Sequence, residues 1–258
     1  IARAICALDP VASVLVSDRL AGPFLPQLWF WPETKPTALA LPGGNFVPVV
    51  PWRESDALDS FAERAALVGR HCSSITGDSW AVLGLWERLV GYWGPARDVR
   101  PRQLSMVIDD EPKASPDPQV RFSQPSDFPV LLPACIAMFT EEIGYSPILG
   151  SRETYEARVR WNIDNRRSFV RMGPDGVEFK AEVGAIGFGV AQIQGVWVPP
   201  HLRGQGRAIA GMAAVVNAIR AEIAPCAALY VNDFNTAAIA VYRRIGFRTV
   251  GEYATVLF

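Results

Sequence analysis

The sequence Gly195-Val-Trp-Val-Pro-Pro-His-Leu-Arg-Gly-Gln-Gly-Arg-Ala208 decides the fold of the C-terminal half of the chain. It predicts a buried strand, a loop with glycines at 204 and 206, and a long alanine-rich helix. Glycines let backbone N–H groups approach a ligand closely, and the first N–H groups of a helix have no partner within it. The stretch therefore predicts an anion-binding loop at a helix N-terminus, and a pyrophosphate fits it.

Two common phosphate-binding loops do not match this stretch. The G-K-[ST] ending of the nucleotide-binding P-loop is missing after Gly206. The third glycine and the spacing of the dinucleotide-binding fingerprint are missing as well. The loop therefore belongs to another class of anion site.

A second informative stretch runs from Leu229 to Phe247 and reads Leu-Tyr-Val-Asn-Asp-Phe-Asn-Thr-Ala-Ala-Ile-Ala-Val-Tyr-Arg-Arg-Ile-Gly-Phe. It predicts a short strand followed by a helix. Asn235 is a favoured residue at a helix N-cap. Ala238 and Tyr242 are four residues apart, so both lie on one face of that helix, one turn from each other.

Together the two stretches resemble the GNAT acyltransferase superfamily. Arg203-Gly-Gln-Gly-Arg-Ala208 satisfies the signature [QR]-x-x-G-x-[GA] of the coenzyme A loop in that family, in its usual place after the fourth strand. The second stretch follows the family pattern N-x-x-A-x-x-x-Y-x-x-x-G-F from Asn235 to Phe247. The resemblance covers residues 119–258 and implies the mixed α/β fold of a GNAT domain.

The resemblance implies acetyl-CoA as co-substrate, bound where the strands predicted at 191–198 and 228–232 diverge. The backbone of Val196 and Val198 would pair with the pantetheine amides, and residues 203–208 would hold the pyrophosphate. The cofactor-binding residues implied in this way are Val196, Trp197, Val198, Arg203, Gly204, Gln205, Gly206, Arg207, Ala208, Asn232, Asn235, Ala238 and Tyr242.

The resemblance also implies direct transfer of an acetyl group to a primary amine, without a covalent enzyme intermediate. Tyr242 would protonate the departing thiolate. Many family members carry a general-base glutamate near the start of the fourth strand, where this chain has Val190, Gln192 and Gln194. The nearest carboxylate is that of Glu182, which we therefore name as the candidate base.

The strand pattern around that base and the other candidate bases come from the sequence itself. Alternation along Val177–Val183 predicts that Glu178, Lys180 and Glu182 share one face of a strand. Glu141 and Glu142, at the end of a predicted helix, and a base that acts through water are the alternatives.

A proline-rich segment near the middle of the chain predicts two domains. Glu111–Pro118 holds three prolines and no apolar residue larger than alanine, so it cannot form a helix or a central strand. We expect a degenerate GNAT-like domain at 1–110, a linker at 111–118 and the catalytic domain at 119–258. Residues 51–56 replace the phosphate loop in the first domain, without a glycine and with two acidic residues, so no coenzyme A is expected there.

The order of predicted elements is similar in the two halves, with strands alternating with helices as in a mixed α/β fold. The helices are predicted at 10–20, 56–68, 79–90, 126–142, 153–164, 203–223 and 236–245. The strands are predicted at 27–31, 37–41, 45–50, 73–76, 103–108, 120–123, 168–172, 177–183, 191–198, 228–232 and 252–258.

Composition limits the remaining possibilities. The 258 residues are 50% hydrophobic and 20% charged with a net charge of −1, which indicates a folded protein without a nucleic-acid or membrane partner. The apolar run Pro129–Phe139 is too short to span a bilayer. The four cysteines lie far apart, which favours free thiols in the cytoplasm over a disulfide framework or a metal site.

Other functions stay open from the sequence. The missing strand-four carboxylate favours a non-catalytic acyl-CoA sensor or scaffold, whereas Tyr242 favours an enzyme. A transferase for a longer acyl group is a third possibility. The sequence does not distinguish a small amine, a peptide amine and a protein lysine as acceptor, nor does it give the oligomeric state.

Overall fold

The computed structural model describes all 258 residues and contains eight α-helices. Short 3₁₀ turns at Pro125–Asp127, Pro147–Leu149 and Pro200–Leu202 connect some of them. The helices are α1 (Ala2–Cys6), α2 (Val14–Ala21), α3 (Ser55–Val68), α4 (Ser79–Trp93), α5 (Phe128–Ile143), α6 (Arg152–Asp164), α7 (Arg207–Glu222) and α8 (Thr236–Ile245). None of them is both long and apolar enough to cross a lipid bilayer.

All strands join one mixed sheet, in the order β1-β2-β3-β4-β11-β5-β10-β9-β8-β7-β6. The predicted mixed α/β fold is thus confirmed. The strands are β1 (Trp29–Trp31), β2 (Ala38–Leu41), β3 (Asn45–Val49), β4 (Ser74–Asp78), β5 (Asp98–Ile108), β6 (Arg121–Phe122), β7 (Ser168–Gly173), β8 (Gly176–Gly187), β9 (Val190–Trp197), β10 (Cys226–Asn232) and β11 (Arg248–Leu257).

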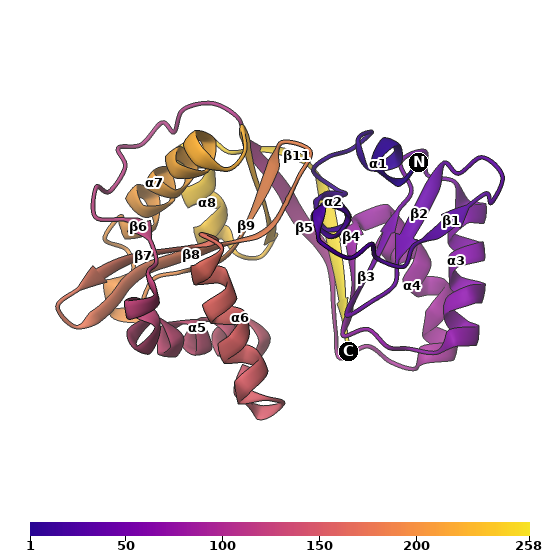
Figure 1. Cartoon of the computed structure of the whole chain (residues 1–258), viewed down its shortest axis with the longest axis horizontal. Coiled ribbons are helices and arrows are strands. Elements are labelled where there is room, and N and C mark those ends of the chain that lie inside the picture. The colour runs from indigo at the N-terminus through magenta and orange to yellow at the C-terminus, as the bar shows by residue number, and fades with distance from the viewer.

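Two helical layers enclose the C-terminal half of the sheet (Figure 1). The main core packs α7 and α8 on one face, where Phe179 and Val183 of β8 meet Met212 and Val216 of α7. On the other face, α5 and α6 bury a smaller cluster around Leu131. The apolar faces of these helices therefore hold the sheet in place, and the candidate site lies at one edge of that sheet.

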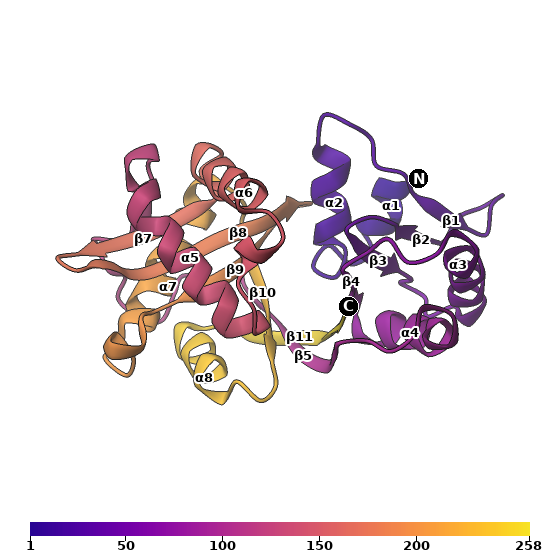
Figure 2. The same ribbon diagram turned by 90° about the horizontal axis from the view of Figure 1, so that it is seen from below.

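The N-terminal half repeats this arrangement on the other side of the molecule (Figure 2). Helices α3 and α4 cover one face, with Phe61 and Leu85 fully buried against Ile75 of β4. The segment α1–α2 covers the other face and buries Ile5 and Val16 against β2 and β3. Each half is thus a helix–sheet–helix sandwich.

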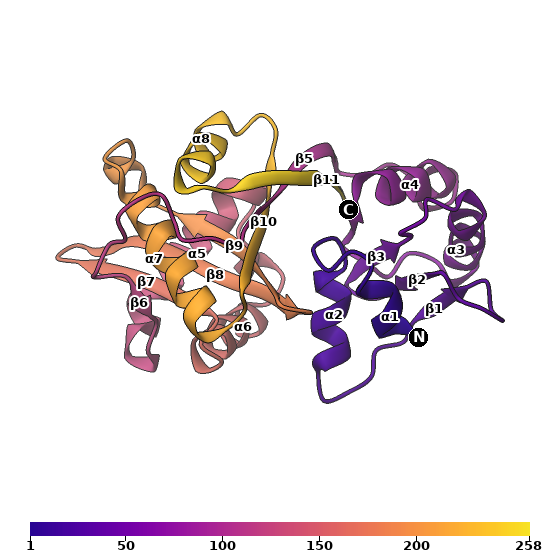
Figure 3. The same ribbon diagram turned by 90° about the horizontal axis from the view of Figure 1, so that it is seen from above.

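Strands β5 and β11 cross between the halves as a pair of antiparallel neighbours (Figure 3). Residues 103–108 of β5 pair with β10, so Met106 and Ile108 enter the C-terminal core. Residues 253–257 of β11 pair with β4, so Ala254 and Val256 enter the N-terminal core. The core of each half therefore includes a strand that comes from the other half of the sequence: β5 in the C-terminal half and β11 in the N-terminal half.

Several predicted elements differ in extent from those observed. The helix predicted at 203–223 begins at Arg207, because the glycines at 204 and 206 adopt positive φ angles that end the loop there. The helix predicted at 10–20 is observed as α2, which begins at Val14 after a turn that contains Pro10, and α1 was not predicted. The predicted strands 103–108 and 252–258 are longer, since each continues into the other half.

One register prediction was wrong. A bulge between β7 and β8 pairs Arg171 with Phe179 and then Met172 with Val177. Glu178 is therefore turned toward Arg207 of α7, whereas Lys180 and Glu182 lie on the face covered by α5 and α6. The simple alternation fails because a bulge inserts one extra residue into a strand.

A partly buried ion pair joins α2 to the C-terminal half. Asp18 Oδ1 accepts hydrogen bonds from Nη2 of Arg167 at 2.8 Å and from the backbone N–H of Ile186 at 3.0 Å. The Asp18 and Arg167 side chains are only 18% and 15% exposed. Next to them, a Cβ on Gly187 would come within 2.3 Å of the Cβ of Ser17, so α2 lies tightly against the end of β8.

We expect Asp18→Ala to lower the free energy of unfolding by about 2 kcal/mol, since it leaves the Arg167 guanidinium without its partner. Urea unfolding followed by circular dichroism measures this value. The control Arg152→Ala removes a pair whose arginine is 62% exposed, and we expect it to cost about 0.5 kcal/mol or less. Equal effects of the two variants would contradict the structural role of Asp18.

Candidate active site

The parallel strands β9 and β10 pair over only three residues and then separate. Val190, Ala191 and Gln192 align with Cys226, Ala227 and Ala228, and no pairing follows. Beyond these residues the two strands diverge toward their carboxyl ends at Trp197 and Asn232, and we call this split between them the opening. Such an opening between diverging parallel strands is a common place for a ligand in α/β folds.

The loop after β9 holds a run of free backbone donors. The N–H groups of the five consecutive residues 204–208 donate to no acceptor in the protein. Gly204 and Gly206 have φ angles of +75° and +77°, and a Cβ on either would meet nothing within 4 Å. Unpaired N–H groups at the N-terminus of a helix, as here at α7, are the donor arrangement with which proteins bind anions.

Side chains of the same loop hold it against the sheet and α5. Arg203 donates from Nε to the carbonyl of Val198 at 3.0 Å and from Nη2 to Oε2 of Glu141 at 2.7 Å. Trp197 donates from Nε1 to the same carboxylate oxygen at 3.2 Å. The hydrogen bond from Arg203 holds the pKa of Glu141 below its usual range. Glu141, an alternative base in the sequence, is thus a partner of the loop.

Two further residues of the loop are held from outside it. Arg207 forms an ion pair with Glu178 of β8 at 2.5 Å. Gln205 donates from Nε2 to the carbonyl of His201 at 3.3 Å. Ala208 lies in the first turn of α7, where its side chain packs against the C-terminal core. The loop conformation is therefore fixed on both sides of Gly206.

Helix α8 starts at the same edge of the sheet as this loop, since β9 and β10 are parallel. Asn235 caps it, with Oδ1 accepting the N–H of Ala238 at 3.1 Å. Ala238 packs against the C-terminal core, and Tyr242 follows one turn later, 8% exposed. The structure thus brings the predicted cofactor-binding residues, from Val196 to Tyr242, to one edge of the sheet.

The phenol of Tyr242 stays protonated over a wide pH range. Burial raises its pKa, and the negative charge of Glu142 raises it further. Glu142 is the one charged group that contributes to this shift. A phenol that keeps its proton at neutral pH can give it to an anion formed nearby.

The candidate base Glu182 lies apart from these residues. It is 5% exposed and sits on the face covered by α5 and α6, whereas Tyr242 belongs to the core beneath α7 and α8. Its Oε1 contacts Nζ of Lys180 at 2.7 Å, and its Oε2 accepts from Nδ2 of Asn162 at 3.2 Å. Its catalytic role stays a prediction.

Comparison with known proteins places the C-terminal half in a family. Residues 145–247 match the model of the acetyltransferase (GNAT) family. The matched segment includes the loop 203–208 and helix α8. This segment belongs to the GNAT acetyltransferase family. Residues 26–131 match a domain of unknown function, DUF4081. No curated protein matches the chain closely enough to count as a relative.

Solved structures of proteins described as GNAT acetyltransferases share the overall fold of this chain. A GCN5-related N-acetyltransferase from Sphaerobacter thermophilus has a TM-score of 0.59 at 16% identity, covering 97% of this chain and 92% of that one. One from Kribbella flavida gives 0.59 at 16% identity, with 96% and 94% covered. An acetyltransferase from the GNAT family from Colwellia psychrerythraea gives 0.57 at 10% identity, with 89% and 84% covered.

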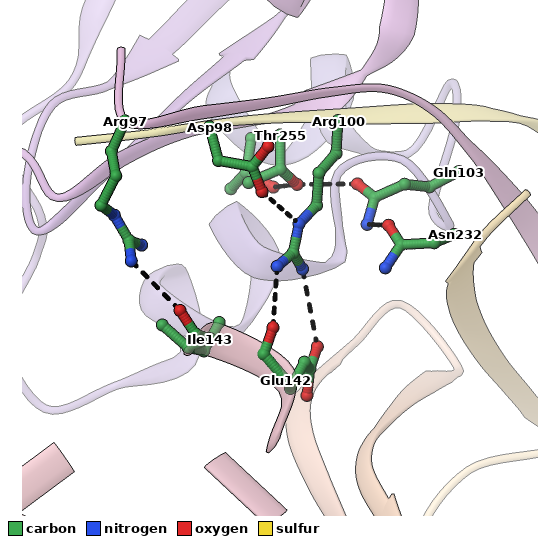
Figure 4. Close-up of polar contacts among 9 residues, drawn as sticks. Arg97, Asp98, Arg100, Gln103, Glu142, Ile143, Asn232 and Thr255 are labelled. Atoms are coloured by element: carbon green, nitrogen blue, oxygen red, sulfur yellow. Dashed lines mark hydrogen bonds and ion pairs between the residues drawn. The ribbon is translucent and has the colours of Figure 1, made fainter. Parts of the chain in front are cut away.

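A polar network that the sequence did not reveal supports the GNAT domain at Asn232 (Figure 4). Asn232 Oδ1 accepts from Nε2 of Gln103 at 3.0 Å, and Gln103 Oε1 accepts from Oγ1 of Thr255 at 2.7 Å. Thr255 in turn contacts Oγ1 of Thr76 at 3.2 Å. The chain of contacts crosses β10, β5, β11 and β4. No local motif marks Gln103, because its partners lie more than 120 residues away.

Two arginines before β5 and within it hold the end of α5 next to the GNAT site (Figure 4). Arg100 donates to the carbonyl of Glu142 at 3.0 Å and lies 3.8 Å from its carboxylate. Arg97 donates to the carbonyl of Ile143 at 3.2 Å and stacks on Tyr145. Cations at a helix C-terminus satisfy its free carbonyls. The N-terminal half thereby fixes where Glu142 lies.

The N-terminal half has a counterpart of the GNAT opening. Strands β3 and β4 are parallel and pair over only two residues, Asn45 and Phe46 with Ser74 and Ile75. A cavity of about 140 Å³ lies beyond this point, with Asp9, Ala12, Pro48, Val49, Val50, Pro51, Arg53 and Asp78 around it. The expectation that it binds no coenzyme A stays a prediction, supported by its small volume and two carboxylates.

Proposed function

We propose that the chain is an acetyl-CoA-dependent N-acetyltransferase that moves an acetyl group directly to a primary amine. One observation carries the proposal: the five unpaired N–H groups of residues 204–208, set at the opening between β9 and β10. The dipole of a helix stabilises an anionic group at its N-terminus by about 0.3–1 kcal/mol. A pyrophosphate has enough oxygens to use several of these N–H groups at once.

The residues of the opening have distinct roles in this proposal. Residues 204–208 hold the pyrophosphate, and the backbone of Val196 and Val198 pairs with the pantetheine. The N–H of Val198 has no partner in the protein, which leaves it free for this contact. Ala238 leaves room beside the pantetheine. Bound acetyl-CoA supplies an acetyl thioester.

Tyr242 acts as the general acid that protonates the departing thiolate. Glu142 is a second candidate base, because its side chain is 52% exposed and its charge raises the pKa of Tyr242. Glu182, Glu142 or a water molecule takes the proton of the amine. The four free cysteines fit a reducing compartment, and we place the reaction in the cytoplasm.

We expect Tyr242→Phe to lower kcat by about 100-fold, because it removes the proton donor. Acetyl-CoA affinity should change little, since the phenyl ring keeps the packing against Phe247. Initial rates of thiol release at saturating acetyl-CoA measure the first effect, and calorimetry measures the second. A variant as fast as the wild type would remove Tyr242 from the mechanism.

The raised pKa of Tyr242 has a consequence for the pH profile. Because burial shifts this pKa above its ordinary value of 10.0, deprotonation of Tyr242 cannot reduce the rate below that pH. We expect kcat measured between pH 6 and about pH 10 to show no decline that Tyr242→Phe removes. A decline near pH 9 that is present only with Tyr242 would contradict this assignment.

The proposed function is tested by thermal unfolding with acetyl-CoA, followed by an acceptor screen with a polyamine, an amino sugar, a free amino acid and a lysine-containing peptide. Acetyl-CoA at a hundred times its Kd adds about 2.7 kcal/mol, which raises the Tm by several degrees. Such a shift with acetylation of one amine supports the transferase. A shift without acetylation would indicate an acyl-CoA sensor, and no shift would overturn both.

A further inference from the structure

Lys180 of β8 is completely buried next to β9, and it has no role in the mechanism proposed above. Its side chain is 0% exposed. Its Nζ contacts Oε1 of Glu182 at 2.7 Å and donates to the carbonyl of Gly195 at 3.0 Å. A buried ammonium group needs such partners, because the loss of its water is costly. The carbonyl of Gly195 is thereby held from below the sheet.

Gly195 is the point where β9 leaves regular pairing with β8. Lys180 aligns with Trp197, and Glu182 aligns with Gln194, so two residues of β9 stand opposite one residue of β8. Gly195 has a φ angle of +59°, and a Cβ there would lie 3.2 Å from Nζ of Lys180. This bulge redirects the backbone just before Val196, the first residue assigned to the pantetheine.

Glu182 is fully engaged as the counter-ion. Besides Lys180, it accepts from Asn162 at 3.2 Å, and the thiol of Cys135 lies 3.7 Å away. Burial works to raise the pKa of Glu182, but the charge and hydrogen bond of Lys180, together with the charge of Arg158 and the hydrogen bond of Cys135, hold that pKa below its usual range. A carboxylate in this state is a weak proton acceptor.

We propose that Lys180 is a positioning residue of the transfer reaction: held by Glu182, it fixes the bulge at Gly195 and so aims the backbone of residues 196–198 at the thioester. The inference rests on the proposed function for its chemistry. It assigns Glu182 the role of counter-ion in place of general base.

Three variants separate the two roles of Glu182. Lys180→Met combined with Glu182→Gln removes both charges, so no unpaired charge is left buried, while the Gly195 carbonyl loses its donor. Glu182→Gln alone keeps that donor. Lys35→Met, at an exposed lysine without an ion-pair partner, is the control.

Positioning by Lys180 predicts that the double variant loses at least 10-fold in kcat with an acetyl-CoA Kd within 3-fold of the wild type. Lys35→Met should stay within 3-fold in kcat, and Glu182→Gln alone, which keeps the donor to the Gly195 carbonyl, should lose less kcat than the double variant. A loss with Glu182→Gln alone that equals the loss in the double variant would overturn the proposal and make Glu182 the base. The rates are measured with the amine that the screen identifies.

A second readout does not depend on turnover. The amide ¹⁵N shift of Val196 depends on the hydrogen bond to the preceding carbonyl, so the double variant should move it in ¹H–¹⁵N spectra without ligand. Glu182→Gln should move it much less. An unchanged Val196 signal in the folded double variant would overturn the proposal, even if the chain acetylates no amine.

Discussion

Replacing Gly206 by glutamate should weaken acetyl-CoA binding by about 100-fold or more while leaving the chain folded. Gly206 has a φ angle of +77° at the N-cap of α7, in the middle of the five free N–H groups. A carboxylate there repels the pyrophosphate, and like charges in a binding site cost several kcal/mol, each 1.4 kcal/mol being tenfold in affinity. Isothermal titration calorimetry measures the change.

The matched control for this experiment is Gly69→Glu. Gly69 ends α3 in the N-terminal half with a φ angle of +83°, and a Cβ there would meet nothing within 4 Å. It adds the same charge far from the loop, so the wild-type affinity should be kept. If both variants bind acetyl-CoA like the wild type, the loop 204–208 is not the pyrophosphate site.

The second large effect concerns stability. Val256→Asp should unfold the N-terminal half, although residue 256 lies at the other end of the chain. Val256 is 0% exposed and packs in the core beneath α3 and α4. Burying an unpaired carboxylate there costs about 4 kcal/mol or more, a large part of the 5–15 kcal/mol of a typical domain.

Hydrogen exchange read by mass spectrometry locates this effect. We expect α3, α4 and β4 to lose protection in Val256→Asp. The control Val250→Asp, on the same strand but 45% exposed, should keep it. Full protection of the N-terminal half in Val256→Asp would mean that β11 contributes little to that core.

The parts of the molecule that were predictable from sequence are those set by local chemistry. Gly204 and Gly206 indicated the loop with unpaired N–H groups, because glycine adopts positive φ angles without strain. Asn235 indicated the start of α8, because its side chain caps the helix. The spacing of Ala238 and Tyr242 placed both on one helix face. These features depend only on residues within one or two turns.

The parts that were not predictable depend on residues far apart in sequence. The strands that contain Met106 and Val256 were found, but no local pattern tells a strand which sheet it will join. The partnership of Lys180 with Gly195 needed the bulges in β8 and β9, which alternation alone does not show. The linker and domain limits around residues 111–118 stay a prediction.

The exchange of β5 and β11 has a consequence for how the chain is made. During translation, β4 has no strand on the side where residues 253–257 will pair with it, because those residues are synthesised after the whole GNAT segment. Such distant pairing slows folding and leaves an apolar strand edge exposed in the nascent chain. The N-terminal half therefore cannot be transplanted as an independent module by gene fusion unless the β11 segment travels with it.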